Sequence, residues 1–136
     1  MSDDQSDLAF VRTRIADYRA YADEYARHDT DMRVRAYVGE RLSAAQTRVA
    51  SALDPAATQA LDATLLRCMF GDQPFLRRLQ HADLDDVATA ALVASDRALI
   101  ETADRLSGAD AAALPALVAQ IGERLDARLP DGRITR

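Results

Sequence analysis

The feature that most constrains this chain is the spacing of its apolar residues, which recur every three or four positions. That period places them on one side of an α-helix, whereas a half-buried strand needs strict alternation. No alternating stretch in the sequence is long enough to suggest a strand. The sequence therefore predicts an all-α fold, an antiparallel bundle of four to five helices with short connections.

The first apolar stripe ends near Tyr25, and a second stripe with a different phase begins at Val34. Two interpretations of residues 6–53 remain open. In one, the helix breaks within residues 28–31 and Thr30 caps a second helix, because Asp and Thr compete with helical hydrogen bonding. In the other, a single long helix contains a stutter. The break is favoured.

Clear capping signals divide the rest of the chain. Asp54 followed by proline is typical of a helix start, and Gly71 is a natural stop. Further helices are predicted over residues 74–80, over residues 84–106 with Asp83 as the cap, and over residues 114–125. These boundaries leave only short connections, so neighbouring helices are expected to pack antiparallel.

Length and charge narrow the class of protein. A chain of 136 residues, 49% of them apolar, is suited to one domain over residues 1–136 with its own core. The formal net charge is −5, and all 17 basic residues are arginine. Neither half of the chain is basic, so we expect no nucleic-acid partner and no attachment to an anionic membrane.

Several chemistries are excluded by composition. Without lysine the chain has neither a Schiff-base nucleophile nor a phosphate-binding loop, and its five glycines are too scattered for a dinucleotide turn. We predict no cofactor, and the balance favours a protein that is not an enzyme. The absence of lysine and asparagine, with abundant alanine, indicates a GC-rich bacterial gene. An acidic N-terminus and a single cysteine predict a cytoplasmic protein.

The stretch 68–81 contains the only cysteine, one of two histidines and two phenylalanines. We interpret it as a hinge between helices, with Cys68 in the core and both phenylalanines plugging the corner, rather than as a thiolate–imidazole site. His28 and His81 fall near predicted helix C-termini with acids nearby. We interpret both as solvated caps and predict no metal site.

The four tyrosines fall within twenty residues, and arginines border the apolar face of the next helix. Phenol hydroxyls beside guanidinium groups can receive an anionic small molecule, although tyrosine and arginine also occupy ordinary core margins. The candidate ligand pocket consists of Tyr18, Tyr21, Tyr25, Arg41 and Arg48.

The predicted helix over residues 84–106 has two faces. Small residues at Ala88, Ala91, Ser95 and Ala98 suggest close packing against a neighbour. On the opposite side, Val93 and Ile100 stand seven residues apart beside Arg97. These three residues are the candidate interface of a homodimer, and the alternative contact is the edge of the first helix with Tyr21 and Arg14.

Two functions from different classes follow. The first is a non-catalytic interaction module that self-associates or docks on another protein. The alternative is a helical bundle that binds, or acts on, a small anionic ligand in the tyrosine–arginine pocket. A filled core with exposed apolar helix faces favours the first, and a concave pocket enclosing the tyrosine hydroxyls favours the second.

Overall fold

The computed structural model describes residues 3–71 and 73–128. All regular structure in these two ranges is helical, and none of their helices is both long and apolar enough to cross a membrane. In chain order the helices are α1 (Asp3–Arg14), α2 (Arg27–Val49), α3 (Pro55–Phe70), α4 (Gln73–Gln80), α5 (Asp86–Asp104) and α6 (Leu114–Asp126), with 3-10 turns at Glu24–Ala26, Ala50–Ala52 and Arg105–Gly108.

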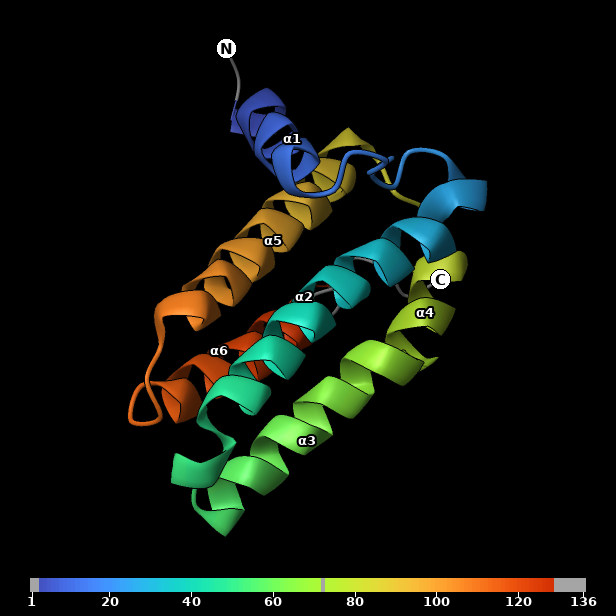
Figure 1. Cartoon of the computed structure of the whole chain (residues 1–136). Helices are drawn as coiled ribbons and strands as arrows, with labels where there is room; N and C mark the ends of the chain where they lie inside the picture. Colours follow the sequence, from blue (N-terminus) through green and yellow to red (C-terminus); the bar gives the residue numbers. More distant parts are fainter. Residues whose placement is uncertain (1–2, 72, 129–136) are drawn as a thin grey trace.

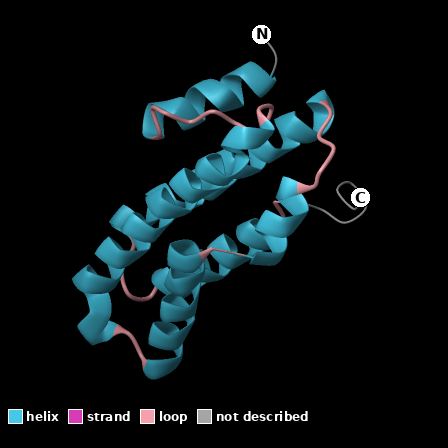
Figure 2. Ribbon diagram, turned by 90° about the vertical axis from the view of Figure 1, so that its right-hand side faces the viewer, coloured by secondary structure: helices cyan, strands magenta, loops and turns pink. Residues whose placement is uncertain are grey.

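Four long helices form the body of the molecule. Contacts run from α2 to α3, from α3 to α6, from α6 to α5 and from α5 back to α2. Helix α1 lies across one end of α5, and the short α4 packs on α2 (Figure 1). Short loops join the helices (Figure 2). The predicted all-α bundle is confirmed.

Each of the four bundle helices contributes a fully buried aliphatic side chain to the core. Leu42, Leu61, Leu99 and Ile121 all have 0% exposure. Burial of each such side chain stabilises the fold by about 1.5–3 kcal/mol. The three-and-four spacing seen in the sequence is therefore used as expected, with one apolar stripe of each helix facing the centre.

The predicted boundaries of α3 are confirmed in atomic detail. Asp54 Oδ1 accepts a hydrogen bond from the Ala57 N–H at 2.7 Å, and Gly71 ends the helix with a φ of +89° that favours glycine. Helix α5 differs from the prediction, since its cap is Asp85 rather than Asp83. Asp85 has the extended backbone a cap needs, and its Oδ1 accepts from an N–H three residues on, at 2.7 Å.

The N-terminal region contains two helices, but the break lies earlier than predicted. Helix α1 ends at Arg14, residues 15–23 form a loop, and Thr30 lies buried inside α2 rather than capping it. The loop exists because Tyr18 and Tyr21 both turn into the interior. Between them, Ala20 takes a positive φ of 56°, an uncommon conformation for a residue with a side chain.

The predicted hinge forms the corner between α3 and α4, and only one of its two phenylalanines is buried there. Cys68 and Phe75 are buried as expected. Phe70, in contrast, is 69% exposed. The reason is position: Phe70 is the last residue of α3 and lies on the side of that helix away from the core, beside Leu66.

Candidate functional site

The interior of the bundle contains a cluster of polar side chains, here called the polar centre: Tyr18, Tyr21, Asp31, Asp96 and Arg128. All five are at most 2% exposed. The tyrosines come from the loop after α1, Asp31 from α2, Asp96 from α5, and Arg128 from the turn after α6. The cluster therefore joins segments that are far apart in the sequence.

The two carboxylates hold the cluster together. Both tyrosine hydroxyls donate to Asp96 Oδ2, Tyr18 at 2.8 Å and Tyr21 at 2.5 Å. Arg128 lies between the carboxylates, with its Nη1 2.6 Å from Asp31 Oδ1 and its Nε 3.5 Å from Asp96 Oδ1. Arg128 Nη2 also donates to the Tyr21 hydroxyl at 3.2 Å. Every member of the centre thus has a partner of opposite charge or a hydrogen bond.

Burial sets the protonation behaviour of the polar centre. Removal from water raises the pKa of Asp96, although the Arg128 charge and the two tyrosine hydroxyls oppose this rise. Burial, with the nearby Asp96 charge, also raises the pKa of Tyr18 and of Tyr21, so both stay neutral donors.

A second arginine extends the cluster toward α3. Arg35 Nε donates to Asp31 Oδ2 at 2.8 Å, and Arg35 Nη1 donates to the Cys68 carbonyl at 2.8 Å. Two carboxylates therefore face two guanidinium groups, and the charges balance. A buried pair of this kind is costly to break, because removing one partner leaves an uncompensated buried charge. The polar centre acts as an internal lock between segments.

The predicted ligand-pocket residues are not brought together. Tyr18 and Tyr21 belong to the polar centre, whereas Tyr25 is 90% exposed near the start of α2. Arg41 stacks on the Tyr37 ring, with 4.1 Å from its Cζ to the ring centroid. Arg48 Nη2 donates to the carbonyls of Leu106 and Ala109 at 2.8 and 2.6 Å. The predicted set therefore does not form a common pocket.

The predicted interface on α5 requires correction. Val93 and Ile100 are 5% and 0% exposed, so they belong to the core, because α1 packs over α5. On the small-residue face Ala88 is buried, Ser95 and Ala98 are half-buried, and Ala91 is open to solvent. The larger aliphatic residues of α5 bury more apolar area than the alanines, and this decides which face turns inward.

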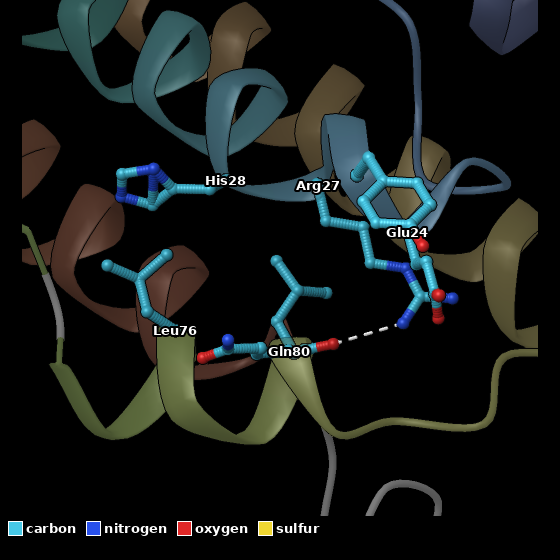
Figure 3. Close-up of a pocket in the computed structure, with 7 residues that line it drawn as sticks. Glu24, Arg27, His28, Leu76 and Gln80 are labelled. Carbon is cyan, nitrogen blue, oxygen red and sulfur yellow. Dashed lines mark hydrogen bonds between the residues drawn. The ribbon is translucent and has the colours of Figure 1, made fainter.

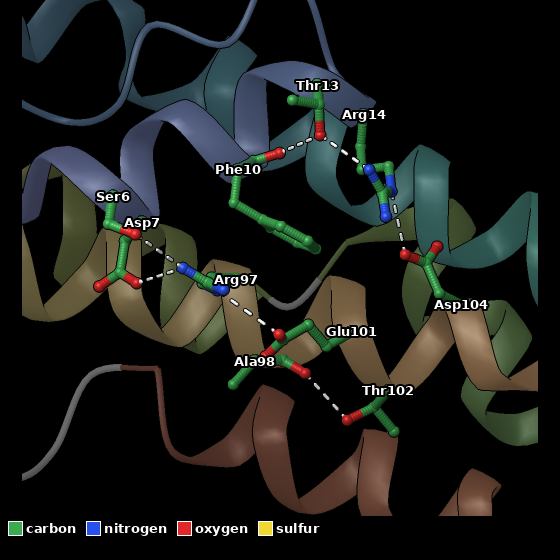
Figure 4. Close-up of polar contacts among 10 residues, drawn as sticks. All are labelled: Ser6, Asp7, Phe10, Thr13, Arg14, Arg97, Ala98, Glu101, Thr102 and Asp104. Atoms are coloured by element: carbon green, nitrogen blue, oxygen red, sulfur yellow. Dashed lines mark hydrogen bonds and ion pairs between the residues drawn. The ribbon is translucent and has the colours of Figure 1, made fainter. Parts of the chain in front are cut away.

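Arg97 is engaged within the chain rather than at a surface awaiting a partner. Its Nη1 lies 3.2 Å from Asp7 Oδ1 on α1, and its guanidinium stacks on the Phe10 ring at 4.5 Å (Figure 4). Nearby, Arg14 Nε pairs with Asp104 Oδ2 at 3.0 Å. These contacts fasten α1 to α5 and explain why the α5 face is covered.

A pocket of about 410 Å³ lies between the start of α2 and α4, lined by Glu24, Tyr25, Arg27, His28, Leu76, Leu79 and Gln80 (Figure 3). The buried arginine of this pocket supports the fold, because Arg27 donates to the carbonyls of Tyr21, Leu79 and Ala82 at 2.9–3.1 Å. These bonds tie the N-terminal loop and the end of α4 to α2.

The two histidines and the cysteine lie as follows. His28 is the second residue of α2 rather than near a C-terminus, and His81 follows α4; both are exposed. Over residues 3–71 and 73–128 no group of three His, Cys, Asp or Glu side chains is placed to hold a metal ion. Burial raises the pKa of the Cys68 thiol to about 11, as expected for a core residue.

The most distinctive external feature lies between α2 and α3. A cleft of about 370 Å³, here called the α2–α3 groove, is lined by Met32, Arg35, Ala36, Gly39, Glu40, Ser43, Leu65, Cys68 and Met69. Its floor is narrow because α2 and α3 approach closely at Gly39, where a Cβ atom would lie 3.4 Å from Cys68 Cβ. Most of its lining is apolar or small.

Large apolar side chains surround this groove and face solvent. Met32 and Met69 on its walls are 47% and 61% exposed. Leu66 and Phe70, here called the α3 ridge, are 53% and 69% exposed on the adjoining side of α3. Single exposed apolar residues are common, but a contiguous group beside a groove marks an interaction surface. The sequence did not predict this group. It shows that α3 contains apolar residues, but it does not show which side of the helix faces the core.

Comparison of the chain with protein-family models, curated proteins and solved structures found no match.

Proposed function

We propose that this chain is a non-catalytic, cytoplasmic protein-interaction module whose binding surface is the α2–α3 groove together with the α3 ridge. One observation carries the proposal: four large apolar side chains remain about half exposed or more, Met32 and Met69 on the walls of the groove and Leu66 and Phe70 on the adjoining side of α3. Water contact at such a surface is unfavourable, and a partner that covers it gains about 25 cal/mol for each Å² of apolar area buried.

The distribution of reactive groups supports a binding role over catalysis. The densest cluster of titratable side chains, the polar centre, is enclosed, and its members are committed to one another. The groove itself offers mainly thioether and aliphatic groups, and its polar lining residues are Arg35, Glu40 and Ser43. Methionine is common at binding surfaces because its flexible thioether adapts to different partners.

The alternative, an anionic small ligand, has less support. Of the predicted set, Tyr25 lines the α2–α4 pocket beside Arg27. The Arg27 guanidinium, however, already donates to three main-chain carbonyls. Glu24 also places a carboxylate at this pocket, which opposes an anion.

Site-specific photo-crosslinking in the cells that express the protein tests the proposed surface. A benzophenone amino acid at Phe70 should yield a discrete product that joins a second protein chain, identified by mass spectrometry. The matched control carries the same group at Gln120, exposed on α6. Products from Phe70 that disappear in Met69→Glu, with none from Gln120, support the proposal. No product from Phe70, or equal products from both sites, contradicts it.

A further inference from the structure

We propose that the partner of this surface is a second copy of the chain, joined about a two-fold axis so that the α3 ridge of each copy enters the α2–α3 groove of the other. This inference rests on the proposed function and names its occupant. Three properties of the surface carry it: low charge, matched spacing and sufficient size.

Charge limits which surface of the chain can form a contact between two copies. The chain carries a formal net charge of −5, so two copies repel each other in most orientations. In a two-fold contact the residues near the axis lie close to their own copies, so charged residues there repel each other. A surface that carries little charge avoids this repulsion.

Helix α3 provides such a surface. Only Asp62 and Arg67 carry charge among its 16 residues. Both are engaged within the chain, since Asp62 Oδ1 accepts from Gln46 Nε2 at 2.6 Å and Arg67 Nη2 lies 2.7 Å from Asp126 Oδ1. The α3 ridge and the neighbouring Ala63 thus present a neutral face in a chain that is 29% charged.

The shapes of ridge and groove correspond. Leu66 and Phe70 are four residues apart, so they project about 6 Å from each other along α3. On α2, small residues recur at a similar interval, with Ala36, Gly39 and Ser43 lining the groove. Large side chains one turn apart can insert between successive small residues of a facing helix, as knobs do in holes. Each copy carries the ridge and the groove side by side. The ridge of either copy can therefore enter the groove of the other.

The surface is large enough for a specific contact. A helix of 16 residues is about 24 Å long, and two helices side by side are about 20 Å wide, which gives roughly 500 Å² per copy before side-chain relief. A specific interface should bury at least about 1,000 Å² in total, or about 500 Å² per copy. Exposed side chains increase the area beyond the flat estimate, so α2 and α3 together provide what a dimer needs.

Sedimentation velocity of the full chain between about 5 and 500 µM tests the dimer. We expect a reversible monomer–dimer equilibrium for the natural sequence. Leu66→Gln combined with Phe70→Gln should weaken the dimer by on the order of 100-fold, because each copy loses two buried apolar groups. Ala36→Glu, which fills the groove and leaves α3 intact, should weaken it similarly.

The matched control is Val87→Gln, an exposed apolar residue at the start of α5 that should leave the equilibrium unchanged. Circular dichroism confirms that each variant is folded. A natural chain that stays monomeric at 500 µM overturns the second-copy inference. So does a dimer whose equilibrium is the same in Leu66→Gln/Phe70→Gln. A monomer that still crosslinks from Phe70 to a different protein overturns this inference and leaves the proposed function standing.

Discussion

Two regions of the molecule depart from the usual arrangement of polar side chains outside and apolar side chains inside. The polar centre buries polar groups, and the α3 ridge exposes apolar ones. In the polar centre, two carboxylates, two tyrosines and Arg128 are fully buried, and each has a partner within the chain. On α3, Leu66 and Phe70 are apolar and exposed, and the described chain provides nothing that covers them. The first region is complete within one chain, whereas the second gains stability only when another molecule binds.

This contrast separates two kinds of unusual residue. A buried polar group costs free energy unless its partners are in place, so its presence inside a bundle indicates a role in fixing the fold. A contiguous group of exposed apolar side chains contributes little to the fold, so its presence points to binding. Four predictions test that division, in order of decreasing effect on the free energy of unfolding.

Asp96→Ala should lower the free energy of unfolding by about 3–5 kcal/mol, because it removes the acceptor of both tyrosine hydroxyls and one counterion of Arg128. Urea denaturation followed by circular dichroism measures the loss. Glu101→Ala on the same helix is the control, since Glu101 makes only a partly exposed contact with Arg97. A loss for Asp96→Ala no larger than that for the control would show that the polar centre does not lock the fold.

The buried Cys68 thiol should make the free energy of unfolding depend on pH in the alkaline range. Its pKa is about 11 in the fold and 9.0 in a free thiol, so the thiol contribution is complete below pH 9 and is lost as pH rises toward 11. Between pH 8 and pH 10 the free energy of unfolding should fall by about 1.4 kcal/mol more in the natural chain than in Cys68→Ala. Urea titrations at both pH values measure it, and parallel pH curves would place Cys68 at the surface.

Ala20→Gly should raise the free energy of unfolding by up to about 1 kcal/mol. Ala20 has a φ of 56°, which glycine adopts without steric cost, although the more flexible unfolded chain offsets part of the gain. Ala22→Gly, two residues on and exposed, is the control and should not stabilise. If Ala20→Gly destabilises the protein, the polar centre does not hold this loop in a strained conformation.

Leu66→Ala should change the free energy of unfolding of the monomer by less than about 1 kcal/mol, since the side chain is already half exposed. Leu61→Ala on the buried side of the same helix should cost about 2–5 kcal/mol. Both are measured by urea denaturation at a protein concentration below the dimer range. Equal losses would mean that Leu66 belongs to the fold, and the contrast between the two regions would fail.

The sequence alone determined the helical class and several boundaries. Periodicity and local capping are properties of neighbouring residues, so Asp54, Pro55 and Gly71 identified the ends of α3 without knowledge of the fold. Cys68 is buried, as the sequence predicted. The helical class and the ends of α3 depend on contacts within a few turns of one helix.

Only the tertiary structure decided which apolar residues face the core and which face solvent. Val93 and Ile100 are covered because α1 crosses α5, and Phe70 is exposed because no described element lies over that side of α3. The polar centre was equally hidden, since Tyr21, Asp96 and Arg128 are separated by 75 and 32 positions along the chain. Local periodicity specifies that a helix has an apolar side, but the packing partner, which is chosen by the total area buried, determines whether that side is core or surface.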